Sequence, residues 1–180
     1  MQIHCSWAVT RLLVALVLTS GGWFEARAAH VNIVALGSST TAGRGVGESA
    51  AYPAQLEAML RAKGFDVSVA NAGISGDTSS GMLKRLDSAV PSGTQVLLLQ
   101  LSEGLGRNDA HRGLSLAEAV ANRGDIVGRL RARGIKVIDV PRRGVPLQGD
   151  GVHPTAEGQV LIAQRLLPLV VAAIGGSRRR

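Results

Sequence analysis

The chain has 180 residues, of which 46% are hydrophobic and 18% charged, so it can bury a sizeable core and is too apolar to be intrinsically disordered. Only 3% of the residues are aromatic, which argues against a stacking surface for single-stranded nucleic acid. The formal net charge is +7 without a groove-reading motif, so we expect no specific nucleic-acid partner and a weak attraction to anionic envelope polymers.

The first 28 residues have the pattern of a secretory signal peptide. Arg11 precedes an uncharged apolar run over residues 12–18, and Ala26-Arg27-Ala28 fits a cleavage signal. The run is too short to cross a bilayer, and an N-terminal membrane anchor is the alternative. We therefore predict a periplasmic or secreted mature chain without a transmembrane segment. It would consist of one domain over residues 29–176 and a basic tail over 177–180.

Hydrophobic patterning predicts alternating strands and helices. Short apolar or alternating segments predict strands at 31–36, 65–70, 94–101 and 135–140. Helical spacing predicts helices at 51–63, at 82–90, between the capping box at Ser115 and Gly134, and from 155 to about 174. This order predicts an α/β fold, namely a three-layer α/β/α sandwich with a mostly parallel, flavodoxin-like sheet of four to five strands.

Two helices carry more specific predictions. We expect Leu116, Val120, Val127 and Leu130 to form one apolar face of the third helix. We expect Pro168 to kink the last helix or to end its first half, because proline lacks the N–H that a helix interior requires.

Polar loops follow the first three predicted strands, at residues 37–43, 71–78 and 102–109. The carboxyl ends of parallel strands open on one edge of a sheet, where ligands bind. Asp150 and His153 lie between the last strand and the last helix, and so at the same edge. An acid three residues before a histidine can orient one imidazole, which can then activate a serine hydroxyl such as that of Ser39.

Each of these residues has a structural alternative. Ser39 could be a turn or helix-cap hydroxyl, and His153 a surface histidine beside a proline. His111 is a rival base, although it lacks an acid at comparable spacing and would lie at a helix start. Asp77 is better explained as a helix cap than as a catalytic acid.

A metal site built from Asp150, His153 and Asp109 is the remaining alternative. It lacks a second histidine at ligand spacing, so we predict no metal ion.

Four sequence blocks, taken in order, resemble the SGNH (GDSL-type) hydrolase superfamily. They are Gly37-Ser38-Ser39, residues 71–78 (NAGISGDT), residues 106–109 (GRND) and residues 150–154 (DGVHP). The chain is most similar to the small secreted arylesterase, thioesterase and lysophospholipase group.

The resemblance implies a serine esterase acting on carboxylic esters or thioesters of small molecules or lipids, without a cofactor. Ser39 would form the acyl-enzyme, with His153 as base and Asp150 orienting it. The oxyanion hole would comprise the N–H groups of Ser39 and Gly76 and the amide of Asn108. A catalytically weak glycan- or lipid-binding relative and a polysaccharide O-acetyl esterase are the alternatives.

Three departures from the family pattern affect these expectations. Ser38 stands where the family has aspartate. Residues 102–105 intervene between the third strand and the Asn108 block, which puts the reach of Asn108 in question. Few residues separate the fourth strand from Asp150, which favours a four-stranded sheet with an irregular edge and an open cleft.

Overall fold

The computed structural model describes residues 29–101, 104 and 106–175; the expected signal peptide and basic tail lie outside the described residues. Four parallel strands form one sheet in the order β2-β1-β3-β4. They are β1 (Val31–Gly37), β2 (Val67–Gly73), β3 (Thr94–Gln100) and β4 (Lys136–Asp139). The flavodoxin-like order is confirmed, with four strands.

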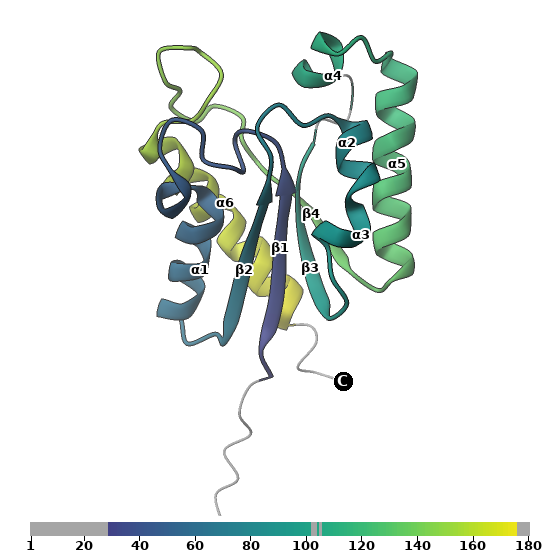
Figure 1. Ribbon diagram of the computed structural model, residues 1–180. Coiled ribbons are helices and arrows are strands. Elements are labelled where there is room, and N and C mark those ends of the chain that lie inside the picture. The colour runs from purple at the N-terminus through teal and green to yellow at the C-terminus, as the bar shows by residue number, and fades with distance from the viewer. Residues whose placement is uncertain (1–28, 102–103, 105, 176–180) are drawn as a thin grey trace, which may run out of the picture.

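Helices cover both faces of this sheet (Figure 1). Helices α1 (Tyr52–Ala62) and α6 (Ala156–Gly175) lie on one face. The opposite face is covered by α2 (Ser79–Lys84), α3 (Leu86–Ala89) and α5 (Leu116–Ala132). A short 3₁₀ helix (Glu48–Ala50) precedes α1, and α4 (Arg107–His111) lies beyond the strand ends. The three-layer sandwich is confirmed.

The central strands are buried on both sides, which explains their continuous apolar runs. Ile33 and Ala35 of β1 pack in the core cluster with α1 and α6. Val34 and Leu36, which alternate with them, pack in the second cluster with α2, α3 and α5. The two hydrophobic cores therefore meet at β1 and β3 and hold the loops that follow these strands in fixed positions.

The structure corrects several local predictions. The expected helix over 82–90 forms two short helices, and the first is capped by Thr78, whose side chain accepts the N–H of Gly81. Asp77 is therefore not the cap; it pairs with Arg85 at 2.8 Å. His111 ends α4 rather than starting a helix. Helix α4 was not predicted, because five residues are too few to show a helical period.

The predicted apolar face of α5 is confirmed for Val127 and Leu130, which pack in the core, and is wrong for Leu116 and Val120. Leu116 and Val120 are 56% and 47% exposed, and the buried positions are Ala119, Ile126 and Leu130. Val120 lies about 100° around the helix axis from Ala119, away from the sheet. The first turns of α5, which begins at Leu116, also rise beyond the strand ends (Figure 1).

Helix α6 continues through Pro168, so the expectation that proline ends its first half is wrong. Pro168 is exposed, and water can hydrate the carbonyl group that loses its helical partner there. Among the described residues, α6 is the one helix long and apolar enough to cross a membrane, with a mean hydropathy of 1.6. Its side chains Ile162, Leu166 and Val170 are buried in the core, which accounts for this composition.

Two leucines of α5 test this packing. Leu130→Ala should lower the free energy of unfolding by about 2–5 kcal/mol, because Leu130 is fully buried and the change leaves a cavity. Leu116→Ala in the same helix should cost less than about 1 kcal/mol, because that side chain is exposed. Urea unfolding followed by circular dichroism measures both, and equal losses would contradict the packing described.

Candidate active site

The loop after β1 brings Ser39 to the carboxyl edge of the sheet, where it meets a histidine from the other end of the chain. Ser39 Oγ lies 2.9 Å from His153 Nε2, although 114 residues separate them. His153 Nδ1 lies 2.5 Å from Asp150 Oδ2. The structure thus brings the three predicted residues into one hydrogen-bonded chain.

The Asp150–His153 turn is rigidly built. The second carboxylate oxygen of Asp150 accepts the backbone N–H groups of Val152 (2.9 Å) and His153 (3.0 Å). The hydrogen bond from the His153 ring, followed by these two N–H groups, holds the pKa of Asp150 well below its ordinary value. An ionised Asp150 accepts a hydrogen bond from Nδ1–H, so the proton of the neutral ring stays on Nδ1 and Nε2 is left to accept the hydroxyl proton of Ser39.

Gln100, the last residue of β3, holds the loop that carries Ser39 through hydrogen bonds to Ser38. Its side-chain oxygen accepts the backbone N–H of Ser38 at 3.0 Å and the Ser38 hydroxyl at 3.2 Å. Thr41 Oγ1 lies 3.5 Å from the same oxygen. Ser38, which replaces the family's aspartate, therefore has a neutral partner, because a glutamine carbonyl can accept from a hydroxyl and an amide N–H together.

Gln159 links this loop to α6. Its amide nitrogen donates to the carbonyl of Thr40 at 3.0 Å, and its oxygen accepts the N–H of Tyr52 at 3.0 Å. Gln159 is fully buried, as is Tyr52, whose hydroxyl lies 3.1 Å from Thr41 Oγ1. Burial raises the pKa of Tyr52, so this phenol stays neutral. Sequence reasoning missed these residues; a glutamine within the apolar α6 was the available signal, although α6 has a second glutamine, Gln164, which is exposed.

The end of β2 approaches the same loop so closely that only glycine fits. A Cβ atom at Gly73 would lie 2.3 Å from the backbone nitrogen of Ala42. One at Gly37 would lie 2.1 Å from Thr41 Oγ1. Gly73 thus lets the end of β2 pack directly against the first loop, and Gly37 lets that loop fold back over the end of β1.

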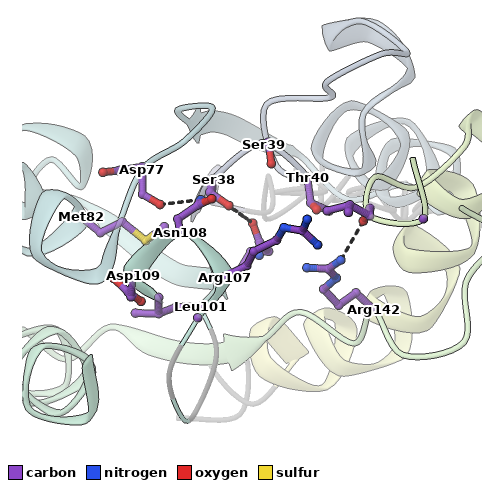
Figure 2. A pocket seen from close by; sticks show the side chains of 14 residues that line it. Ser38, Ser39, Thr40, Asp77, Met82, Leu101, Arg107, Asn108, Asp109 and Arg142 are labelled. Atoms are coloured by element: carbon purple, nitrogen blue, oxygen red, sulfur yellow. Dashed lines mark hydrogen bonds between the residues drawn. The ribbon is translucent and has the colours of Figure 1, made fainter. Parts of the chain in front are cut away.

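Asn108 reaches the pocket in spite of the intervening residues. It lies in the first turn of α4, lines the same pocket as Ser39, and donates its side-chain amide to the carbonyl of Asp77 at 2.8 Å. This bond uses one amide hydrogen and leaves the second available. Figure 2 shows Asn108 beside Ser38 in this pocket.

Gly76 lies next to the pocket that contains Ser39, whereas Asn108 lines it. It has a positive φ of 81°, in the region that favours glycine, and in the described part of the chain its N–H makes no hydrogen bond. Gly76 does not itself line the pocket, although its neighbour Asp77 does. The backbone N–H of Ser39 is likewise without a partner among the described residues.

Two further acids have structural partners. Asp77 pairs with Arg85, which also donates to the carbonyl of Gly37 at 3.2 Å. Asp109 is buried and accepts the N–H of Ser79 at 2.8 Å, which ties α4 to the start of α2. Within the residues that the structure describes, no three His, Cys, Asp or Glu side chains gather as a metal-binding group.

The pocket beside Ser39 has a volume of about 240 Å³. Its wall is mostly polar, with Met82, Leu101 and Val152 as its larger apolar side chains. Two arginines, Arg107 and Arg142, also line it (Figure 2). His111, the rival base, does not line this pocket.

Comparison with known proteins identifies the family of this chain. The GDSL-like lipase/acylhydrolase family matches residues 35–149. The chain belongs to this family. The matched region contains Ser39, Gly76 and Asn108 and ends one residue before Asp150, so the structure, rather than the family match, joins the Asp–His pair to the serine.

Two relatives of this chain are named as esterases. The chain is 35% identical over 112 residues to esterase TesA of Pseudomonas aeruginosa, a match that covers 62% of this chain and 54% of that protein. It is 31% identical over 121 residues to an arylesterase of Vibrio mimicus, covering 67% of this chain and 59% of that one. The chain thus spans little more than half the length of these curated relatives.

A solved structure of TesA has the same fold. It superposes with a TM-score of 0.68 at 24% identity and covers 79% of this chain and 99% of that one.

A substitution in α6 tests the support of the nucleophile loop. Gln159→Leu should lower the free energy of unfolding by about 1–3 kcal/mol, because it leaves the Tyr52 N–H buried without a partner and leaves the Thr40 carbonyl only the N–H of Gly43 at 3.3 Å. Gln164→Leu, at an exposed position of the same helix, should change it by less than about 0.5 kcal/mol. Chemical denaturation of the two variants measures the difference, and similar stabilities would show that Gln159 supports nothing.

Proposed function

We propose that the protein hydrolyses carboxylic esters through an acyl-enzyme on Ser39. The observation that carries this proposal is the chain of two hydrogen bonds, 2.9 Å and 2.5 Å long, from Ser39 through His153 to Asp150. A serine that only caps a turn, or a histidine that only lies at the surface, would not need an ionised aspartate on Nδ1 while Nε2 faces the serine hydroxyl. Membership of a lipase/acylhydrolase family supports the same chemistry.

The mechanism follows from the donor and acceptor roles in this chain. Ser39 Oγ attacks the acyl carbonyl carbon while its proton passes to His153 Nε2, and Asp150 stabilises the resulting imidazolium. The tetrahedral intermediate then breaks its bond to the leaving group, which takes the proton from Nε2. Water, activated by His153, attacks the acyl-enzyme and frees Ser39 and the carboxylic acid. A thioester follows the same steps with a thiol as leaving group.

The oxyanion requires hydrogen-bond donors that are already in position. We assign this role to the backbone N–H groups of Ser39 and Gly76 and to the second amide hydrogen of Asn108. The two backbone groups lack other partners in the described part of the chain. The bond from Asn108 to the Asp77 carbonyl fixes the amide plane, and so the direction of its second N–H.

The pocket favours small acyl groups. Its volume of about 240 Å³ is below the range of roughly 300–1,000 Å³ that is typical of sites for drug-sized ligands. Its polar wall offers few contacts to a long alkyl chain. We therefore propose short-chain esters as substrates, in the periplasm or outside the cell as the signal-like N-terminal sequence indicates.

The nucleophile can be tested directly. Ser39→Ala should lower kcat for p-nitrophenyl acetate by at least about 10³-fold, because no base-activated hydroxyl remains. Intact mass spectrometry after treatment with a fluorophosphonate should show one adduct, with fluoride lost, on the wild type and on Ser38→Ala but none on Ser39→Ala. Undiminished hydrolysis by Ser39→Ala would refute the mechanism. A wild type without adduct would instead favour a binding protein of the same fold.

The oxyanion role of Asn108 makes a separate prediction. Asn108→Ala should lower kcat by about 10²–10³-fold with a small change in KM, because the lost hydrogen bond forms only with the developing charge. Asn122→Ala is the matched control: that amide bonds Ser79 at 3.1 Å but does not line the pocket, so kcat should stay close to wild type. Asn108 and Asn122 both bond residues at or beside the start of α2. An equal fall in kcat in both variants would therefore mean that Asn108 only supports this segment and does not bind the oxyanion.

A further inference from the structure

Two arginines occupy the wall of the pocket, and the proposed mechanism uses neither. Arg107 is the first residue of α4, and Arg142 lies in the loop after β4. Both line the same cavity as Ser39 and Asn108. In the view of Figure 2, the ends of both side chains lie on the same side of the pocket, opposite Asp77 and Asp109.

Neither guanidinium is neutralised within the described residues. The side chain of Arg107 makes no hydrogen bond or ion pair with the described residues. Arg142 donates one Nη2 bond to the carbonyl of Val152 at 3.0 Å, which fixes its position without cancelling its charge. A guanidinium has five N–H donors, so most of the donors of Arg142 remain free.

The acids that share this pocket do not cancel these charges. Asp77 is only 10% exposed at its side chain and is paired with Arg85 at 2.8 Å. Asp109 is 2% exposed and accepts the N–H of Ser79. Among the described residues that line the pocket, the side near Arg107 and Arg142 is therefore positive.

A positive wall in a pocket for neutral esters has no evident use. Two like charges facing one small cavity repel each other, and a neutral acyl chain gains little from guanidinium groups. A carboxylate or a phosphate, in contrast, fits the planar fork of arginine, and one such anion can accept from two arginines at once.

We propose that the preferred ester carries an anionic group, a carboxylate or a phosphate, close to the scissile bond, and that Arg107 and Arg142 bind this group. The proposal rests on the ester hydrolase function proposed above and narrows its substrate class. The anion lies on the acyl part or on the leaving group, and the two arrangements are distinguished by the choice of substrate.

Matched substrate pairs test the proposal. On the acyl side, mono-4-nitrophenyl glutarate is compared with 4-nitrophenyl valerate, its neutral analogue. On the leaving-group side, 4-acetoxybenzoate and 4-acetoxyphenyl phosphate are compared with phenyl acetate. Each kcat/KM is divided by the rate of alkaline hydrolysis of the same ester, so that intrinsic reactivity cancels. We expect the anionic ester to be preferred in at least one arm, and less so at high salt because ions screen the attraction.

Variants then connect this preference to the two side chains. Arg107→Gln and Arg142→Gln should each lower the anionic-to-neutral ratio of kcat/KM by about tenfold, the usual effect of losing one charge-assisted hydrogen bond. Arg131→Gln is the matched control, because Arg131 is exposed in α5 and does not line the pocket. Circular dichroism and unfolding midpoints confirm that each variant is folded.

The outcomes separate the two proposals. Hydrolysis of neutral esters at Ser39 without any preference for an anionic partner would overturn the inference about the arginines and leave the esterase standing. A preference that survives in both arginine variants would also overturn it. Absence of Ser39-dependent hydrolysis for every ester, neutral or anionic, would refute the esterase function and this inference with it.

Discussion

The buried amide of Gln159 holds together the parts of the molecule on which the site depends. It reaches from α6 to the carbonyl of Thr40, next to Ser39, and to the N–H of Tyr52 at the start of α1. Helix α6 begins directly after the turn that carries His153. This side chain therefore ties the serine loop to the helix that follows the histidine turn, although the two segments come from opposite ends of the chain. Gln148 bridges the same two segments, because its side-chain amide donates to the carbonyls of Arg44 (2.9 Å) and Pro154 (2.8 Å). The 2.9 Å hydrogen bond between Ser39 and His153 tolerates little displacement.

Much of this arrangement could be predicted from the sequence. Alternating buried strands and amphipathic helices specify a parallel sheet, and the sheet geometry alone places the loops after β1, β2 and β3 on one edge. The spacing of Asp150 and His153 was equally informative, because a three-residue turn lets one carboxylate accept two backbone N–H groups and a ring N–H. These features depend on local patterns, which a single sequence displays.

The remaining features depend on tertiary contacts that have no local pattern. Whether Leu116 and Val120 are buried depends on how far the sheet extends beneath α5, and both proved exposed. The reach of Asn108 depends on the path of the chain after β3. The roles of Gln100 and Gln159 arise from which carbonyl or N–H happens to face them across the core. A polar residue within an apolar segment indicates such a role but does not identify its partner.

The amide supports of the nucleophile loop have a consequence for turnover. In the proposed mechanism His153 gains and loses a proton twice in each catalytic cycle, so the local charge alternates. Gln100 and Gln159 carry no charge and do not titrate, so they hold Ser38 and Thr40 by the same hydrogen bonds in every protonation state of the histidine. A charged side chain in either place would interact differently with the neutral and the protonated histidine, so its hydrogen bonds to the loop would change with each proton transfer. These two supports of the nucleophile loop therefore stay neutral throughout turnover, while the charge changes on the histidine and on the oxyanion of the substrate.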